Sequence, residues 1–175
     1  MKKILETERL ILREYTPDDF EALYAIVGDA ETMKHFPKPY DERGTKYWIS
    51  WSMEHCAEHG FGFWAVISKE TGELIGNCGL TMQIIDGESL PEIGYHFRRD
   101  CWNRGYAKEA ASAVRDWAFA NTEYPALYSY MTRGNEASVR TAAAIGMKKT
   151  GEFTDAHYGE MYVYALTRED YRSHG

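Results

Sequence analysis

The chain has 175 residues, enough for one domain with its own hydrophobic core. It contains 44% hydrophobic and 27% charged residues, as ordinary globular proteins do, so disorder is not expected. The net charge of −7 argues against binding to nucleic acid or an anionic membrane, because both attract basic surfaces. An acidic chain is better suited to a cationic partner such as an amine.

The cysteines and the apolar runs bear on location. Cys56, Cys78 and Cys101 are far apart and form no Cys-x-x-Cys pair. We therefore expect no disulfide framework, no metal site, and a reducing compartment. No apolar run follows the N-terminal lysines, and no long uncharged apolar segment occurs, so neither a secretion signal nor a membrane span is expected. The expected location is the cytoplasm.

The N-terminal part of the chain predicts a strand followed by a helix. The apolar run at residues 10–14 is the strand. Thr16, Pro17 and Asp19 have the types and spacing of a helix start with a capping box. Apolar residues then recur at helical spacing until Gly28, which is expected to end the helix.

The middle of the chain predicts a second helix and three strands. Asp41 can cap this helix, and Gly60 can close it. Trp48 and Trp51 lie along one of its stripes and are interpreted as core or as a pocket wall. Short polar turns separate the strands, so an antiparallel meander is expected. The three strands cover residues 63–68, 73–85 and 90–97.

The C-terminal part predicts a crossover unit. Residues 105–120 are expected to be helical, with Ala110 and Val114 on one face. A strand, a helix and a strand in this order indicate a parallel βαβ crossover. Asn135 is expected to cap a further helix that stops at Gly146. The remaining strands cover residues 126–131, 149–153 and 160–166.

Residues 97–107 join a predicted strand to a predicted helix through a polar turn. A helix N-terminus exposes unpaired N–H groups and the positive end of the dipole, which together bind anions. Gly105 lets the backbone approach a bulky anion, Ala107 keeps the first turn slim, and Arg104 adds charge. Neither the Walker loop nor the dinucleotide fingerprint matches. These residues alone predict a phosphate-bearing ligand, with an ordinary helix start as the alternative.

Four segments in order resemble the GNAT superfamily of N-acetyltransferases. Residues 102–110 read Trp-Asn-Arg-Gly-Tyr-Ala-Lys-Glu-Ala, which is similar to its motif A, Arg/Gln-x-x-Gly-x-Gly/Ala. Residues 8–13, residues 92–95, and residues 135–140 with the Ile-Gly-Met that follows them resemble the RimJ/RimL-type branch of ribosomal-protein acetyltransferases. The resemblance covers nearly the whole chain.

The resemblance implies an α+β fold in one domain, residues 1–175. Its sheet would be mixed, mostly antiparallel and seven-stranded, flanked by about four helices. The sheet would splay into a V between its fourth and fifth strands.

The resemblance also implies acetyl-CoA as cosubstrate, and no metal. The pantetheine arm would pair with the backbone of the fourth strand, and the pyrophosphate would lie on the start of the helix that follows. Asn135 and Ser138 would contact the pantetheine or adenosine portion. The strand residues are Tyr95, His96 and Phe97, and the helix-start residues are Asn103, Arg104, Gly105, Tyr106, Ala107 and Lys108.

Acetyl transfer requires a base, because an alkyl amine with a pKa near ~10 is mostly protonated at pH 7. Glu92 is the candidate base; the alternatives are a solvent-facing carboxylate or a group that binds the substrate amine. Strand parity places His96 on the same face, where we expect a structural role. Tyr130 is the candidate donor to the leaving thiolate, with plain packing as the alternative. Both candidates lie on strands next to the expected splay.

Some positions depart from the family pattern or stay open. The first Arg/Gln of motif A is Trp102 here, and the position of a tyrosine general acid found in many relatives is Ala142. His157 and Tyr158 precede the last strand and either line the acceptor pocket or form an exposed loop.

The sequence thus predicts an acetyl-CoA-dependent N-acetyltransferase in which a primary amine attacks the thioester directly. The acceptor is a peptide N-terminus or a small molecule, and the chain is a monomer or a homodimer. One alternative is a catalytically weak CoA-binding regulatory module, which the missing tyrosine favours. The other is a nucleotide-phosphate binder outside the superfamily.

Overall fold

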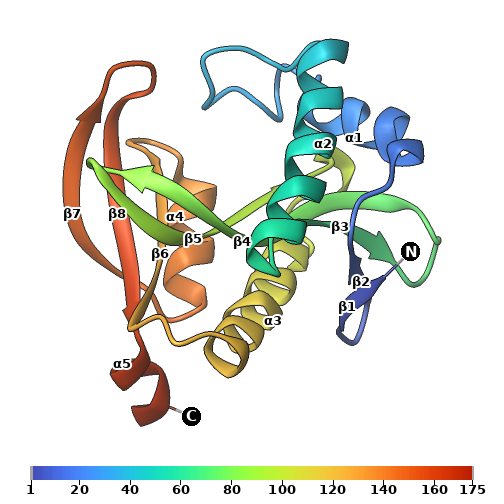
Figure 1. The fold of residues 1–175 in the computed structure, drawn as a ribbon. Coiled ribbons are helices and arrows are strands. Elements are labelled where there is room, and N and C mark those ends of the chain that lie inside the picture. The colour runs from blue at the N-terminus through green and yellow to red at the C-terminus, as the bar shows by residue number, and fades with distance from the viewer. Residues whose placement is uncertain (1, 175) are drawn as a thin grey trace.

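The computed structural model describes residues 2–174, in which eight strands form one sheet. The order across the sheet is β1-β2-β3-β4-β5-β6-β8-β7, and neighbours are antiparallel except for the parallel pair β5 and β6 (Figure 1). The strands are β1 (Lys3–Glu6), β2 (Leu10–Arg13), β3 (Phe63–Ser68), β4 (Leu74–Ile85), β5 (Glu88–Phe97), β6 (Ala126–Thr132), β7 (Lys148–Asp155) and β8 (Gly159–Thr167).

Five α-helices accompany the sheet in the part of the chain that the structure describes. Two α-helices lie in the N-terminal half, and α3 follows β5 as the crossover to β6, as the strand-helix-strand order predicted. The helices are α1 (Phe20–Val27), α2 (Glu42–His59), α3 (Tyr106–Asn121), α4 (Glu136–Ala144) and α5 (Arg168–Ser173), with short 3₁₀ turns η1 (Pro17–Asp19) and η2 (Arg99–Cys101).

The predicted helix starts are confirmed by their caps. The Thr16 N–H donates to Asp19 Oδ2 at 2.8 Å, one half of the expected capping box. The Gly44 N–H donates to Asp41 Oδ1 at 2.7 Å at the start of α2. At α4, the Ser138 N–H donates to Asn135 Oδ1 at 3.3 Å. Side-chain oxygens thus satisfy N–H groups that the helices cannot pair internally.

The predicted count of seven strands and four helices was wrong by one of each. β1 has four residues and pairs with β2 at the edge of the sheet, and α5 has six residues with none buried. Neither element buries an apolar face long enough to produce a clear hydrophobic period. Their positions depend on the neighbouring strand or helix, which local sequence does not describe.

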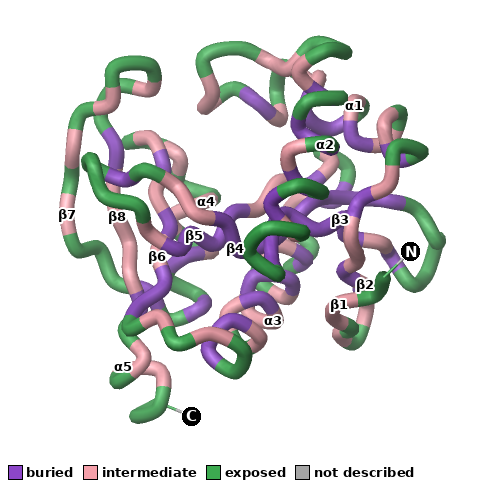
Figure 2. The backbone as a smooth tube through the Cα atoms, viewed as in Figure 1, coloured by how far each residue is buried: buried purple, intermediate pink, exposed green. Residues whose placement is uncertain are grey.

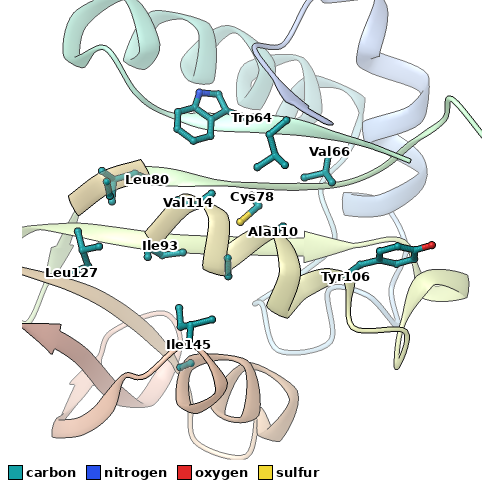
Figure 3. Packing of buried hydrophobic residues seen from close by; sticks show 14 of the residues in the cluster. Trp64, Val66, Cys78, Leu80, Ile93, Tyr106, Ala110, Val114, Leu127 and Ile145 are labelled. Carbon is teal, nitrogen blue, oxygen red and sulfur yellow. The ribbon is translucent and has the colours of Figure 1, made fainter. Parts of the chain in front are cut away.

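Two clusters of buried side chains hold the helices on opposite faces of the sheet. The larger one packs α3 against the central strands; in Figure 3, Ala110 and Val114 of α3 lie beside Cys78 and Ile93, and Tyr106 lies at the start of the same helix. The smaller one packs α1 and α2 on the other face. Figure 2 shows the buried backbone concentrated in the central strands and the inner side of α3. Burial of these apolar faces is what places the helices.

The sheet splays between β5 and β6. The two strands pair at one position, Glu92 with Tyr128, and the Ser129 hydroxyl donates to the Ile93 carbonyl at 2.7 Å. Beyond this vertex they separate. Because β1 precedes the predicted strands, β5 and β6 are the fourth and fifth strands of the prediction, and the expected V is confirmed.

Candidate active site

A cleft of about 890 Å³ opens from the vertex between β5 and β6 toward the start of α3. The start of α4, the loop before α2 and α2 itself complete its walls. The cleft brings together the following predicted site residues: Glu92, Tyr95, His96, Phe97, Asn103, Gly105, Tyr106, Ala107, Lys108, Tyr130, Asn135 and Ser138. Arg104 is not among its lining residues; its guanidinium lies 5.2 Å from the centroid of the Tyr106 ring.

One edge of β5 faces the cleft with its backbone. The Ile93 carbonyl accepts from Ser129 and the Phe97 carbonyl accepts from the Trp102 indole at 2.8 Å, so both point away from β4. Backbone groups of an antiparallel strand alternate between its two edges. Tyr95, which lies between them, therefore presents its N–H and C=O to the cleft, whereas the His96 backbone faces β4. An extended ligand can pair with Tyr95 as an added strand would.

The start of α3 forms an anion cradle. Gly105 has φ +80°, a conformation that favours glycine, and the first α-helical hydrogen bond joins the Glu109 N–H to the Gly105 carbonyl. The N–H groups of Tyr106, Ala107 and Lys108 precede that bond. They are the unpaired donors of a helix N-terminus, and together with the positive end of the dipole they can bind an anion.

A partly buried clamp holds the cradle against the turn between β1 and β2. Glu109 Oε1 accepts from the Thr7 hydroxyl at 2.6 Å and from the Arg9 N–H at 2.9 Å, and Glu109 Oε2 lies 2.6 Å from Arg9 Nε. Arg9 Nη1 also donates to the Arg104 carbonyl at 2.9 Å. Burial opposes ionisation of Glu109, but the Thr7 and Arg9 hydrogen bonds outweigh it and lower its pKa.

We expect Glu109→Ala to lower both stability and acetyl-donor affinity. The substitution removes the acceptor of three hydrogen bonds, so unfolding free energy should fall by about 1–3 kcal/mol. The cradle backbone loses its anchor, so KM for acetyl-CoA should rise severalfold. Thermal unfolding and steady-state kinetics measure the two effects. Glu58→Ala, at an exposed site on α2, is the matched control; equal effects in both variants would contradict the clamp.

Glu92 lies at the vertex, where the cleft begins. Its residue is 8% exposed, and the Thr81 hydroxyl lies 3.4 Å from Oε2. Burial raises the pKa of Glu92 to about 8. β4 and β5 pair over ten consecutive positions without a bulge, so Glu92 and His96 share a face, as strand parity predicted. A buried carboxyl with a pKa near neutrality is suited to accept a proton.

His96 also lines the cleft, and the side chains of Asn77 and Trp48 fix the position of its ring. Nδ1 lies 2.9 Å from the Asn77 side-chain oxygen, and the ring centroid is 5.3 Å from that of Trp48. Burial lowers the pKa of His96 to about 4. The imidazole is therefore neutral at pH 7, which agrees with a positioning role rather than with the role of a charged group.

Tyr130 and Tyr158 line the cleft opposite β5, and His157 does not. Burial, and then the nearby Glu92, raise the pKa of Tyr130, so its hydroxyl stays protonated. Tyr158 packs edge-on against Phe36, with ring centroids 5.9 Å apart. The His157 side chain is exposed on the turn between β7 and β8.

The position of the family tyrosine contains no hydroxyl. Ala142 is fully buried on α4. The Tyr95 hydroxyl reaches the same helix, but it donates to the Ser138 carbonyl at 2.9 Å. Tyr130, whose side chain lies near Glu92, stays the candidate donor, and the hydroxyls of Tyr40 and Tyr158 line the same cleft.

Several wall residues were missed in the sequence. Phe36 and Tyr40 come from the proline-containing loop between α1 and α2, and Phe63 comes from β3. Residues 63–68 were predicted as a strand, but neither periodicity nor a motif indicated that these rings face a ligand cleft. Trp48 and Trp51, interpreted as core or pocket wall, line the cleft as well.

Comparison with known proteins identifies the family. The sequence model described as "Acetyltransferase (GNAT) domain" matches residues 9–148. The chain belongs to the GNAT acetyltransferase family. The uncharacterised Bacillus subtilis protein YkkB is 35% identical over 147 residues, 83% of this chain and 86% of that protein.

Solved structures agree with this fold. A GNAT acetyltransferase from Bacillus anthracis is 27% identical with a TM-score of 0.80, covering 94% of this chain and 98% of that one. RimL, the ribosomal L7/L12 alpha-N-protein acetyltransferase, solved in complex with coenzyme A, is 14% identical with a TM-score of 0.78, covering 97% of this chain and 99% of RimL. At this identity, the likeness to RimL shows the shared fold alone.

GNAT acetyltransferases use acetyl-CoA, and the cleft fits it. The free backbone of Tyr95 suits the pantetheine amides, and the cradle suits the pyrophosphate. Across residues 2–174, no helix is long and apolar enough to cross a membrane. The same residues contain no cluster of three or more His, Cys, Asp or Glu side chains that could hold a metal ion.

Proposed function

We propose that this acetyltransferase moves acetyl from acetyl-CoA to a primary amine that attacks the thioester directly. The position of Glu92 carries the proposal. It is a buried carboxyl at the vertex where the ligand-facing edge of β5 meets β6. The amine nitrogen adds to the thioester carbon, and the C–S bond then breaks. The nitrogen loses two protons: one passes to Glu92 and on to solvent, and the other replaces the proton that Tyr130 gives to the sulfur, so CoA leaves as the thiol.

The residues of the cleft divide this work. Acetyl-CoA supplies the acetyl group as a thioester. Tyr95 pairs with the pantetheine arm through its backbone, and the first turn of α3 binds the pyrophosphate. Asn135 uses its side-chain oxygen to cap α4, which leaves its NH₂ group for the ligand. The predicted cofactor contacts of Phe97, Asn103, Gly105 and Ser138 belong to the same proposal, and Arg104, which lies outside the cleft, is left out of it.

Glu92 and Tyr130 supply the proton transfers. Ionised Glu92 takes a proton from the ammonium group of the acceptor, directly or through water. The Tyr95 N–H stabilises negative charge on the thioester oxygen as a backbone donor. Tyr130 donates to the sulfur as it leaves. A thiolate is a stable leaving group, so we expect this last contribution to be the smallest.

The cysteines and two sequence motifs bear on the location of the enzyme and on its branch of the family. We propose that the chain acts as one domain, as a monomer or homodimer in the cytoplasm, since Cys56, Cys78 and Cys101 are free thiols. The motifs at residues 8–13 and 135–140 support a place in the RimJ/RimL-type branch. Its acceptor is then an α-amine of a protein or the amine of a small molecule, with no nucleic acid or membrane involved.

A screen for thiol release tests the proposal. The full chain is mixed with acetyl-CoA and with peptides or small amines, and CoA thiol is followed with a chromogenic disulfide. We expect at least one primary amine to release thiol well above the rate of acetyl-CoA hydrolysis. If acetyl-CoA binds but no amine does so, the chain is instead a CoA-binding regulatory module.

A further inference from the structure

We propose that the acceptor is a small primary amine attached to a flat, uncharged aromatic ring. This inference rests on the acetyl transfer proposed above and specifies its substrate. Its basis is the half of the cleft beside Glu92, where aromatic side chains from separate segments form the wall. We call this part the aromatic chamber, formed by Phe36, Tyr40, Trp48, Phe63, Tyr130 and Tyr158.

Five of the six chamber rings form two contacting groups, and the Tyr130 ring lies beside Phe153 instead, with centroids 6.4 Å apart. Ring centroids are 5.1 Å apart for Tyr40 and Trp48 and 5.3 Å apart for Trp48 and Phe63. The Phe36 and Tyr158 rings meet edge-on, at an interplanar angle of 80°. Aromatic rings favour further rings in offset or edge-to-face contact. A flat substrate ring can make the same offset or edge-to-face contacts with these rings. A flexible aliphatic chain of the substrate would gain only apolar contact.

The Phe36–Tyr158 contact joins the two halves of the molecule. Phe36 belongs to the loop before α2 and Tyr158 to the turn between β7 and β8, both at the top of the view in Figure 1. The chamber is therefore bounded on this side. Its volume is part of the 890 Å³ that the cofactor arm also needs. That total is at the upper end of small-molecule sites, so the room left suits a small acceptor.

The titratable groups of the chamber are uncharged near pH 7. Burial raises the pKa of Glu92 to about 8 and lowers that of His96 to about 4. Burial also raises the pKa values of Tyr40, Tyr130 and Tyr158. The chamber thus presents one carboxyl, which can pair with one ammonium group when it is ionised, and no cation.

The charged residues of the cleft lie toward the cradle. Lys34 pairs with Glu31 at 2.7 Å and lies 5.9 Å from the Trp102 ring, and Arg140 pairs with Glu136 on α4. An amine that also carries a carboxylate or phosphate would leave that anion unpaired in the chamber. A diamine would leave its second ammonium group unpaired. Burying an unpaired charge is costly, so both classes are disfavoured.

A peptide N-terminus is disfavoured for a related reason. Its N–H and C=O groups each need a hydrogen-bond partner when they leave water. The ring faces of Phe36 and Phe63 offer none, so the peptide groups would depend on the hydroxyls of Tyr40, Tyr130 and Tyr158 and on the Trp48 indole N–H, which are too few to pair them all. An arylalkylamine carries no such groups beyond its amine, which Glu92 receives.

Competing acceptors matched to 2-phenylethylamine test the proposal. With the full chain and acetyl-CoA, kcat/KM is measured for 2-phenylethylamine, phenylalanine, 1,4-diaminobutane, trialanine amide and 2-cyclohexylethylamine. We expect 2-phenylethylamine to exceed the carboxylate, the diamine and the peptide by about tenfold or more. Its advantage over the cyclohexyl analogue, which is not flat, should be about threefold.

Different failures have different meanings. Efficient transfer to trialanine amide, the diamine or phenylalanine, equal to that of 2-phenylethylamine, overturns the aromatic-amine proposal and leaves acetyl transfer standing. Equal rates for the phenyl and cyclohexyl amines overturn the requirement for a flat ring. No transfer to any of the five amines overturns the aromatic-amine proposal, and thiol release with the other amines of the screen then decides whether acetyl transfer stands.

A variant of the chamber provides a second readout. Tyr158→Leu should raise KM for 2-phenylethylamine about fivefold, with KM for acetyl-CoA unchanged. Quenching of tryptophan fluorescence by N-acetyl-2-phenylethylamine should weaken by the same factor, without any turnover. His157→Leu, next to Tyr158 but outside the cleft, is the matched control. An unchanged KM in Tyr158→Leu, or an equal rise in His157→Leu, contradicts the chamber.

Discussion

Glu92→Gln is expected to lower kcat about 100- to 1000-fold, because it removes the group that takes the proton from the amine. The amide keeps the size of the side chain, so KM for acetyl-CoA should change little. In the wild type, kcat/KM should rise with pH until about 8, where Glu92 becomes ionised. A pH profile of both enzymes measures this, and the variant should lose the rise. An unchanged kcat would mean that Glu92 is not the base.

The same substitution should stabilise the protein. The pKa of Glu92 is about 8 in the folded protein against an ordinary 4.5, so folding favours the protonated form. This contribution is fully present below pH 4.5 and is lost as the pH rises toward 8. At pH 7 the free energy of unfolding of the wild type is therefore lower by on the order of 3 kcal/mol than at pH 4, and a glutamine at this position avoids that loss.

Thermal unfolding between pH 4 and pH 9 measures the stability effect. The gain in Tm of Glu92→Gln over wild type should be near zero at pH 4 and grow up to pH 8. Glu54→Gln, the same change at an exposed position of α2, should show no such growth. Parallel curves for wild type and Glu92→Gln would contradict the burial of an ionisable carboxyl at the vertex.

Lys108→Glu is expected to raise KM for acetyl-CoA about 10- to 100-fold, since it replaces a cation with an anion beside the bound phosphates. Lys108 lies in the first turn of α3 and lines the cleft. An acidic residue is favoured at this end of a helix, so unfolding free energy should rise by about 0.3–1 kcal/mol at low salt. Weaker binding together with higher stability distinguishes a ligand contact from general damage to the fold.

Arg104→Glu is the matched control for Lys108→Glu. It changes the charge by the same amount four positions earlier, but Arg104 does not line the cleft. We expect a clearly smaller rise in KM, and added salt should weaken what remains because exposed charges are screened. Equal rises in the two variants would show that net charge, rather than contact at the cradle, governs binding. Titration of acetyl-CoA binding by calorimetry measures the affinities directly.

Local sequence was sufficient to predict the residues that cap the helices and the position of the turn before α3. Asp41 and Asn135 cap their helices through contacts within three residues, so the signal lies in the sequence itself. Gly105 marks the start of α3 in the same way. The order of strands and helices, with the crossover after β5, also follows from local pattern. The motif at residues 102–110 then connected the cradle to the GNAT family.

The environment of each side chain was decided only by the tertiary structure. Glu92 is an ordinary strand glutamate in the sequence, and its raised pKa comes from burial where β5 and β6 meet. The aromatic chamber joins Phe36 to Tyr158, which are more than a hundred positions apart, so no local period could indicate their contact. Arg104 looked like a phosphate ligand by its neighbours, but its side chain packs on Tyr106 outside the cleft. Sequence determined the helix caps because their hydrogen bonds are local, whereas β1, α5 and the clamp on the cradle depend on other segments. The acceptor chamber and its pKa values depend on desolvation by distant segments, which only the folded chain supplies.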